Sequence, residues 1–276
     1  MKTQFDKSIE FKRLHERDGA FIIPNPWDAG SARLLAQTGF GALATTSGGY
    51  AFSCGLSDKA VGRERMMVYL AEIAAATELP VSADLENGFG DAPETVADTI
   101  RMAAAAGVVG GSIEDATGNP AAPLYPLELA VARIRAAVEA ARELPFPFLL
   151  TARAENFLVG QPNLSDTIRR LQSYQEAGAD VLFAPGLTSR ADIAAVVSAV
   201  DRPVNVMMGF HGVRLDVADL AGLGVRRVSV GGSLARAALG ACLRAAREMR
   251  EFGTFTYADD AVSSSEINGR FNAVVA

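Results

Sequence analysis

Residues 80–90, with the sequence PVSADLENGFG, are the stretch from which the fold of this chain is best inferred. A proline opens a short apolar run that ends in two carboxylates, Asp84 and Glu86, and a glycine-rich turn. Residues two apart in a strand point to the same side, so these two carboxylates are expected to share one face. Neighbouring carboxylates repel each other unless a cation or a proton lies between them, and hard oxygen ligands suit Mg²⁺ or Mn²⁺. The stretch therefore indicates a metal-binding strand end; the alternative is a polar strand end that leads into a solvated loop.

Similar apolar runs recur along the chain and alternate with helical stretches. Strands are predicted at residues 20–23, 42–46, 81–85, 110–114, 148–153, 180–184, 203–208 and 226–230. Strands that alternate with helices pair in parallel, which is typical of the α/β fold class. Eight such repeats indicate a single (β/α)8 TIM-type barrel. A doubly wound open sheet is the alternative. It is disfavoured by the strand count and because no Gly-x-Gly-x-x-Gly sequence follows the first strand.

We predict one domain, residues 1–276, because no low-complexity linker divides the chain. Within it, residues 1–18 form an N-terminal helix, residues 19–250 the barrel and residues 251–276 a C-terminal helical tail. The tail carries apolar side chains that need a surface to pack against, so packing on a neighbouring subunit, with exchange of the tail between subunits, is predicted. Folding back onto its own barrel is the alternative.

The composition excludes several classes of protein. A net charge of −6 argues against a nucleic-acid surface and a basic membrane patch. No apolar run is long enough to span a membrane, and the charged N-terminal residues are unlike a secretory signal, so a soluble cytoplasmic protein is predicted. The two cysteines are too few for a disulfide scaffold or a cysteine zinc site. None of the lysines lies in a predicted strand, which argues against a Schiff-base aldolase or a pyridoxal enzyme.

The strand ends converge at one mouth of such a barrel, and polar residues gather at these ends. The candidate site residues are Ser47, Gly48 and Gly49 in a predicted glycine-rich turn after the second strand, Asp58 in the loop beyond them, Asp84 and Glu86 after the third strand, Glu114 after the fourth, Arg153 after the fifth and Asn205 in the seventh. Carboxylates around one arginine can hold a divalent cation and an anionic, oxygen-rich substrate together.

Five motifs in this order resemble those of the isocitrate lyase/phosphoenolpyruvate mutase superfamily over nearly the whole barrel. They are PNPWDAGSA at residues 24–32, SGG at 47–49, DLENGFG at 84–90, IED at 113–115 and TARAE at 151–155. The resemblance implies that Asp84 binds Mg²⁺, with Mn²⁺ as the alternative, and that Asp58, Glu86 and Glu114 hold its water shell. It also implies that Ser47, Gly48, Gly49 and Arg153 bind the substrate carboxylate and oxyanion, and that subunits form homodimers or homotetramers.

The chain departs from the superfamily pattern in two places. Glu86 stands where an aspartate is commoner, so its contact with the metal is expected to run through water. Superfamily members that cleave isocitrate or methylisocitrate carry a Lys-Lys/Arg-Cys-Gly-His motif after the fourth strand, and its cysteine is the catalytic acid/base. Residues 116–125 contain no Cys, His or Lys. This loop still resembles a mobile lid, because it is rich in Gly, Pro and small residues.

These observations predict a Mg²⁺-dependent lyase-type enzyme that acts on a small 2-oxo or 2-hydroxy (di)carboxylic acid or a phosphonate analogue. It would break a C–C or C–P bond beside the carbonyl-bearing carbon through an enolate, with Arg153, Glu114 and Asp58 as catalytic residues and Asn205 among the substrate contacts. The alternatives are a non-catalytic 2-oxo-acid-binding protein and a metal-dependent pyruvate aldolase.

Overall fold

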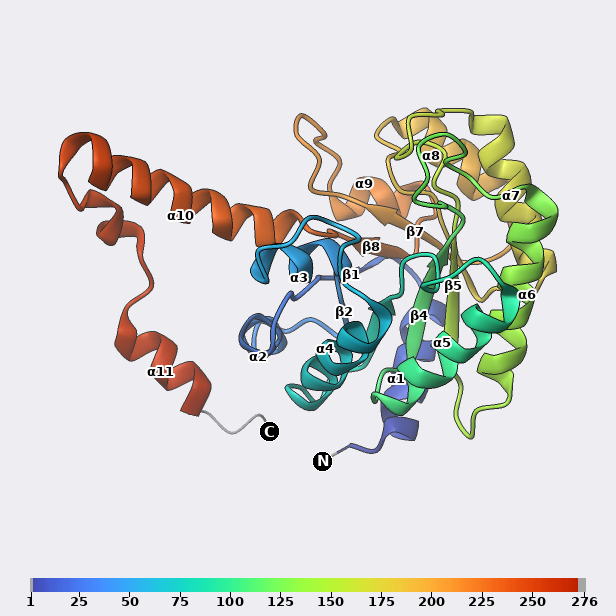
Figure 1. Cartoon of the computed structure of the whole chain (residues 1–276), viewed down its shortest axis with the longest axis horizontal. Helices are drawn as coiled ribbons and strands as arrows, with labels where there is room; N and C mark the ends of the chain where they lie inside the picture. Colours follow the sequence, from blue (N-terminus) through green and yellow to red (C-terminus); the bar gives the residue numbers. More distant parts are fainter. Residues whose placement is uncertain (1, 273–276) are drawn as a thin grey trace.

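The computed structural model describes residues 2–272, and eight parallel strands form its centre (Figure 1). They are β1 (Phe21–Ile23), β2 (Leu43–Ala44), β3 (Val81–Asp84), β4 (Gly110–Glu114), β5 (Leu149–Arg153), β6 (Val181–Phe183), β7 (Val204–Met207) and β8 (Arg227–Ser229). Each strand from β3 to β8 pairs with the one before it, and β1 pairs with β8. The N–H of Ala44 donates to the carbonyl of Pro24 at 3.0 Å and joins the two outer strands. The sheet is thus a nearly closed barrel, and the predicted (β/α)8 TIM-type fold is confirmed.

Helices alternate with the strands, and most of those between β2 and β8 cover the outside of the barrel (Figure 1). They are α1 (Gln4–Glu16), α2 (Ala29–Ala36), α3 (Ser47–Ser53), α4 (Arg63–Ala75), α5 (Pro93–Ala105), α6 (Leu127–Arg142), α7 (Leu164–Glu176), α8 (Arg190–Ser198), α9 (Val217–Gly222), α10 (Ser233–Phe252) and α11 (Ser264–Asn272). Local sequence explains where several of them begin. The side chains of Asp28 and Asn163 accept backbone N–H groups at the starts of α2 and α7, and Pro93 occupies the first turn of α5.

The N-terminal helix closes the end of the barrel opposite the candidate site. Phe11 of α1 is completely buried and packs with Phe21, Ile23, Val109 and Leu149. A Cβ atom on Gly110 would lie 2.8 Å from the Phe11 ring, so this strand position has no room for a side chain. The predicted N-terminal helix is therefore confirmed, and its function in the fold is to fill the bottom of the barrel.

One local prediction is wrong. Ser47, Gly48 and Gly49 were expected to form a glycine-rich turn, but they begin helix α3. Its N-cap is Thr46, whose hydroxyl accepts the Gly49 N–H at 3.2 Å. A Cβ atom on Gly49 would lie 2.6 Å from the methyl group of Thr46 and would also crowd Ala235 of α10. Glycine is needed here for close packing rather than for a turn.

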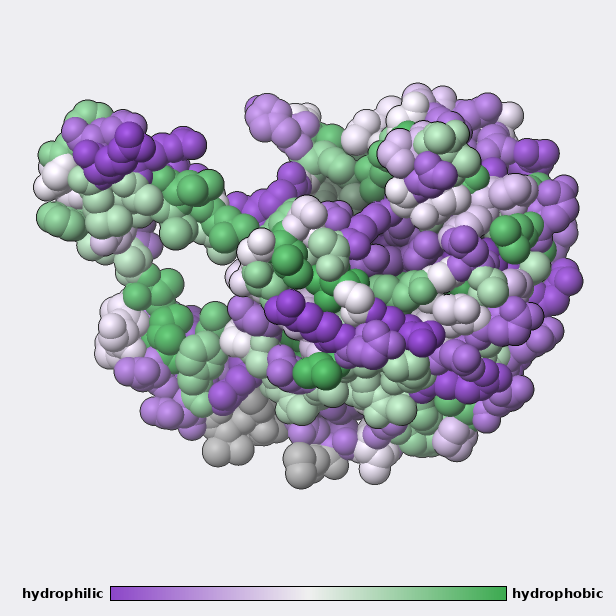
Figure 2. All heavy atoms as spheres, viewed as in Figure 1, coloured by the Kyte–Doolittle hydropathy of each residue, from purple (hydrophilic) through white to green (hydrophobic). Residues whose placement is uncertain are grey.

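The C-terminal segment forms an arm beside the barrel (Figure 1). Helix α10 has 20 residues, of which only Ala235 is buried. A short 3₁₀ helix, Thr256–Asp260, follows, and α11 then returns to the same barrel. There Gln37, the residue after α2, donates to the Arg270 carbonyl at 2.7 Å. Apolar side chains are exposed along the arm, which Figure 2 shows as green patches, and include Leu239, Leu243, Phe252 and Phe255. The end of the described tail thus contacts its own chain, while exchange between subunits stays a prediction.

Across residues 2–272, no helix combines the length and the apolar character that crossing a membrane requires.

Candidate active site

A cavity of about 490 Å³ opens at the C-terminal ends of the strands. Seven of the nine predicted site residues line it, namely Ser47, Gly48, Asp58, Asp84, Glu114, Arg153 and Asn205. Gly49 lies behind the cavity wall in α3, and Glu86 is buried just beyond the end of β3. The barrel therefore brings the predicted residues into one region, as the convergence of parallel strand ends requires.

Asp84 is fixed by hydrogen bonds to both of its carboxylate oxygens. Oδ2 accepts two hydrogen bonds from Ser47, one from the backbone N–H at 3.0 Å and one from the side-chain hydroxyl at 2.8 Å. Oδ1 accepts Nη1 of Arg153 at 2.8 Å. The side chain is 19% exposed and faces the cavity, so it is held in place and still accessible to a ligand.

Arg153 joins three carboxylates at the centre of the site. Besides Asp84, its guanidinium contacts Glu114 at 3.0 Å and Glu155 at 2.8 Å. Burial alone would lower the pKa of Arg153, but the charges of Glu155, Glu114 and Asp84 outweigh it and raise that pKa above its ordinary value. The arginine is a permanent cation here, which suits it to binding carboxylates.

Glu86 is the most strained and least satisfied member of the group. Its backbone has a φ of 49°, in the left-handed region that non-glycine residues rarely adopt. Its Oε1 atom is buried and has no hydrogen-bond partner among the described residues. Burial, followed by the charges of Asp84, Glu114 and Asp58, raises the pKa of Glu86 to about 8. A buried carboxylate in this position calls for a proton or a cation nearby.

A lysine that the sequence analysis placed outside the barrel strands reaches this site. The Nζ atom of Lys59 lies 2.6 Å from Oε1 of Glu114. None of the described strands contains a lysine, as predicted, but this does not exclude a lysine from the mouth, because Lys59 reaches it from a loop. Burial alone would lower the pKa of Lys59, but its charge contact and hydrogen bond with Glu114 raise that pKa, so the amine is a poor nucleophile. The sequence could have indicated Lys59 as a site residue, because it directly follows the candidate residue Asp58.

Asp58 lies against the start of α3. Its carboxylate oxygen Oδ1 would be 3.0 Å from a Cβ atom on Gly48, so a side chain at that glycine would collide with it. Burial and the nearby charge of Asp84 raise the pKa of Asp58 above its ordinary value. The glycine thus lets the loop that carries Asp58 approach the candidate metal site closely.

The predicted substrate contacts are already occupied by protein groups. Ser47 binds Asp84, and the Gly49 N–H donates to Thr46. Asn205 lies deeper in the barrel, where its amide donates to the Ser229 hydroxyl at 3.0 Å and its carbonyl accepts Nε of Arg227 at 2.9 Å. A substrate would have to exchange with some of these partners.

Arg227 is a buried residue that the sequence analysis missed. Besides Asn205, its guanidinium contacts the Thr151 hydroxyl at 3.0 Å and Nε2 of His15 at 3.4 Å, all of them neutral groups. Burial lowers its pKa to about 9. Arg227 lies two residues before Ser229 in β8, so both side chains lie on the same face of the strand. This spacing could have identified Arg227 from the sequence.

The donor set fits a hydrated divalent cation. Among residues 2–272, no three His, Cys, Asp or Glu side chains are arranged so that all could hold one metal ion. The unpartnered oxygen of Glu86 lies in the same group as Asp58, Asp84 and Glu114, and carboxylates here outnumber the cations that touch them. Such hard oxygen donors suit Mg²⁺, which keeps several of its waters and uses few protein ligands directly.

The segment after β4 contains no acid/base group to complete the site. Residues 116–124 form a small loop closed by an antiparallel bridge between Ala116 and Leu124. Thr117 ties the loop together by donating to the Ala122 carbonyl at 2.6 Å. At its base, Asp115 is buried and accepts Arg170 at 3.0 Å and Tyr174 at 2.6 Å, so this carboxylate supports the structure rather than facing the cavity.

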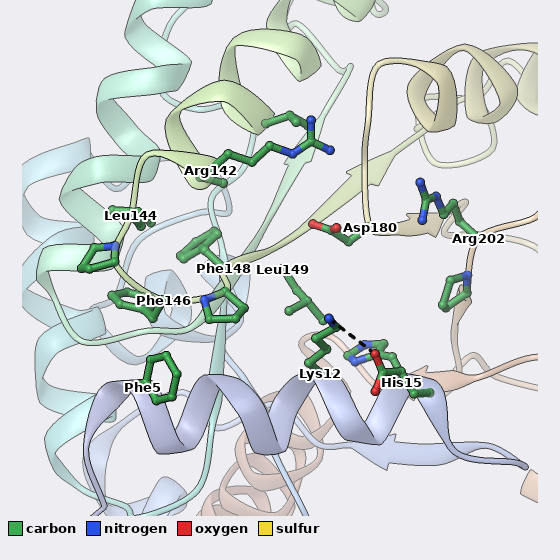
Figure 3. A pocket seen from close by; sticks show the side chains of 16 residues that line it. Phe5, Lys12, His15, Arg142, Leu144, Phe146, Phe148, Leu149, Asp180 and Arg202 are labelled. Carbon is green, nitrogen blue, oxygen red and sulfur yellow. Dashed lines mark ion pairs between the residues drawn. The ribbon is translucent and has the colours of Figure 1, made fainter.

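A second cavity, of about 600 Å³, lies at the opposite end of the barrel (Figure 3). Phe5, Phe146 and Phe148 supply apolar lining, and Arg142 and Arg202 lie at its edge beside Asp180. Although it is larger than the mouth cavity, none of the predicted site residues lines it. The chemistry of the carboxylate and arginine group therefore assigns the candidate site to the mouth.

Known proteins are similar to this chain over most of its length. The sequence profile of the phosphoenolpyruvate phosphomutase family matches residues 11–250. The chain is 32% identical over 202 residues to the 2-methylisocitrate lyase of Escherichia coli K12, covering 70% of this chain and 67% of the relative. It is 27% identical over 273 residues to the oxaloacetate decarboxylase of Chromohalobacter salexigens, covering 96% and 90%.

Solved structures extend the similarity over almost the whole chain. A provisionally assigned lyase/mutase from Burkholderia cenocepacia J2315 is 62% identical, with a TM-score of 0.96 and coverage of 98% of this chain and 97% of that one. A phosphonopyruvate hydrolase in complex with oxalate and Mg²⁺ is 25% identical, with a TM-score of 0.84 and coverage of 97% and 95%.

Proposed function

The chain belongs to the phosphoenolpyruvate phosphomutase family, and on that premise we propose that it is a Mg²⁺-dependent lyase-type enzyme for a small 2-oxo or 2-hydroxy diacid or its phosphonate analogue. Relatives act on such compounds, as the oxaloacetate decarboxylase and the phosphonopyruvate hydrolase illustrate. The observation that carries the proposal is the position of Asp84 at the cavity, fixed by Arg153 at 2.8 Å beside the unpartnered buried oxygen of Glu86.

The proposed metal site uses Asp84 as the direct ligand. Asp58, Glu86 and Glu114 would hold metal-bound water, since the described carboxylates do not supply three converging ligands. When bound, Mg²⁺ supplies a Lewis acid that stabilises negative charge on the substrate oxygen. Ser47 and Arg153 keep the Asp84 carboxylate oriented, which lowers the cost of organising the site when ligand arrives.

Arg153 is the proposed anchor for a substrate carboxylate. Its planar guanidinium can bind a carboxylate through two parallel hydrogen bonds. Because it already contacts Asp84, Glu114 and Glu155, substrate binding would exchange one of these partners for the substrate. Asp58 and Glu114 are proposed to complete the catalytic group, and Ser47, Gly48, Gly49 and Asn205 to form the remaining substrate contacts.

The loop at residues 116–125 decides which reactions this site favours. It offers no cysteine, histidine or lysine for proton transfer to a leaving fragment. Positioned proton transfer contributes about 10²–10⁴-fold to rate. Cleavage of oxaloacetate-like 2-oxo acids depends mainly on stabilising the enolate, so we expect such compounds to be better substrates than isocitrate or methylisocitrate.

Because the same loop lacks an acid/base group, a second candidate function is that of a protein that binds a 2-oxo acid without turning it over. Calorimetry separates binding from catalysis. We expect pyruvate to bind the protein in the presence of Mg²⁺ and to bind much more weakly when Mg²⁺ is replaced by a chelator. Metal-independent binding, or none at all, would contradict the proposed site.

Assembly and cellular location stay predictions. We propose a homodimer or homotetramer in which the exposed apolar side chains of α10 are covered by a second copy of the chain. The bounds that divide residues 1–276 into an N-terminal helix (1–18), a barrel (19–250) and a tail (251–276) stay predictions, as does the cytoplasmic location.

A further inference from the structure

Lys59 occupies an unusual position at the edge of the cavity. Its backbone φ is 64°, in the left-handed region that favours glycine, and its N–H donates to Oδ1 of Asp58 at 2.9 Å. This conformation carries the side chain from the loop after α3 to Glu114, where the ammonium lies 2.6 Å from Oε1. The contact is asymmetric, because the Lys59 side chain is 41% exposed and that of Glu114 only 2%. The lysine side chain is therefore partly open to solvent, while the carboxylate is enclosed by protein.

The ammonium stands where a divalent cation would compete with it. Glu114 is one of the carboxylates proposed to hold the water shell of Mg²⁺. In the structure Lys59 pairs with its Oε1 atom and Arg153 with its Oε2 atom. Two cations near one carboxylate repel each other, so metal binding would weaken the contact between Lys59 and Glu114. The released side chain would remain in the cavity, which it lines, and so lie close to a bound substrate.

The rest of the cavity leaves a role for such a cation. A diacid has a second anionic group beyond the one that Arg153 anchors. The loop at residues 116–125, which borders the site after β4, contains no Lys, Arg or His to receive it. Arg227 is buried at the floor and is held by Asn205 and Thr151. Apart from Arg153 and Arg227, the described residues that line the cavity include two cationic side chains, Lys59 and the exposed Arg236 of α10.

We propose that Lys59 is a specificity-determining residue, which neutralises Glu114 before metal binding and contacts the distal anionic group of a diacid substrate afterwards. This assignment rests on the proposed function, because it needs the metal and the 2-oxo or 2-hydroxy acid to bind at the mouth. It explains how the site could prefer diacids to monoacids although its loop after β4 lacks cations. A flexible, strongly hydrated ammonium suits both contacts, since it forms point-charge interactions in several directions.

Metal binding without substrate tests the first half of the proposal. Calorimetric titration with Mg²⁺ is compared for the wild-type protein, Lys59→Met and Lys59→Arg. Removing the competing ammonium should tighten Mg²⁺ binding by about tenfold in Lys59→Met, whereas Lys59→Arg should stay near the wild type. Unchanged or weaker Mg²⁺ binding by a folded Lys59→Met protein would overturn the role of Lys59 as a counter-ion.

Substrate discrimination tests the second half. Malate and lactate share a 2-hydroxy acid head and differ in the distal carboxylate, so the ratio of their dissociation constants in saturating Mg²⁺ isolates the distal contact. The wild-type protein should prefer malate, and Lys59→Met should lose this preference by about ten- to hundredfold, as expected for one charge-assisted hydrogen bond. Arg236→Met, which removes the other exposed cation of the lining, is the matched control and should keep the preference.

The outcomes separate this inference from the proposed function. A malate preference that survives in Lys59→Met, or is lost in Arg236→Met instead, overturns the assignment of Lys59 while leaving the acid site intact. Failure of the wild-type protein to bind malate, lactate or pyruvate with Mg²⁺ overturns the proposed function, and the assignment of Lys59 falls with it.

Discussion

Nη1 of Arg153 lies 2.8 Å from Oδ1 of Asp84, and this ion pair links the end of β5 to the end of β3 past the intervening strand β4. The other oxygen of Asp84 accepts both the N–H and the hydroxyl of Ser47. The proposed metal ligand is therefore oriented by protein groups from two sides, one of them a cation. Under the proposed function, metal binding has to share or replace these contacts, so the affinity of the site for Mg²⁺ should depend on the same residues that are proposed to position the substrate.

Replacing Asp84 by asparagine should abolish measurable Mg²⁺ binding and leave the fold intact. The substitution keeps the size of the side chain but removes the charge that a hard divalent cation requires. Arg153 retains Glu114 and Glu155 as partners, so no unpaired buried cation results. Calorimetry gives the affinity and circular dichroism the fold.

The matched control for this substitution is Asp98→Asn on the surface of α5, where the carboxylate contacts only the exposed Arg101. It should bind Mg²⁺ like the wild type. An Asp84→Asn protein with undiminished affinity would remove the basis for placing the metal at β3.

The sequence was sufficient to predict the barrel but not all of the site. All eight strands were predicted because each is a short apolar run between turn residues and a helical stretch, and candidates at the strand ends, such as Asp84, Glu114 and Arg153, follow from topology alone. The position of Lys59 depends on the path of a loop and a left-handed φ, which no local pattern encodes.

Two further differences have the same physical origin in tertiary packing. Gly48 and Gly49 suggested a turn. In the structure a glycine is needed at position 49 because α3 lies close to neighbouring side chains such as Ala235, which leaves no room for a larger residue. Arg227 in β8 was not among the predicted site residues, because a charged residue in a short apolar strand is normally exposed to solvent. In the structure it is buried among neutral partners.

Arg133 should be important for stability, because it holds the turn that follows β3. Its guanidinium is fully buried on α6 and donates to the backbone carbonyls of Asn87, Gly90 and Asp91. Arg133→Met would leave these carbonyls without a donor and should lower the free energy of unfolding by about 3 kcal/mol. Urea unfolding measures this change.

Arg135→Met is the control for that experiment, since Arg135 is an exposed arginine on the same helix. It should change the free energy of unfolding by less than about 0.5 kcal/mol. Equal effects of the two substitutions would show that the contacts of Arg133 contribute no special stability.

His15 should make the protein less stable as the pH falls below neutrality. Burial, with the nearby charge of Arg227, lowers the pKa of His15 to about 3 in the folded protein, from an ordinary value of 6.5. Between pH 6.5 and pH 3 the unfolded chain binds a proton at this position and the folded protein does not. Stability contributed above pH 6.5 is therefore lost as the pH falls, by at most about 1.4 kcal/mol per pH unit.

The difference in unfolding free energy between the wild type and His15→Gln isolates this effect from other titrating groups. As the pH is lowered from 7 to 5, the wild type should lose more unfolding free energy than the variant. The exposed His211 provides the matched control, His211→Gln. A difference that stays constant over this range would contradict the assignment of a neutral buried imidazole to His15.

Removal of the tail after Gly253 should disrupt assembly. Exposed apolar side chains, including Leu239, Leu243 and Phe252, lie along α10, and the tail that would be removed carries the exposed Phe255. Light scattering after size-exclusion chromatography should detect monomers or aggregates in place of the native oligomer. A truncated chain with the native oligomeric state would count against a role of the tail in subunit packing.

The most direct test of the proposed function is the rate of pyruvate formation, followed by coupling to lactate dehydrogenase, with oxaloacetate or phosphonopyruvate as substrate in the presence of Mg²⁺. We predict metal-dependent pyruvate formation by the wild-type protein above the uncatalysed rate, none above that rate by Asp84→Asn, and little or no glyoxylate from isocitrate. Rapid cleavage of isocitrate while the 2-oxo acids remain inert would contradict the account.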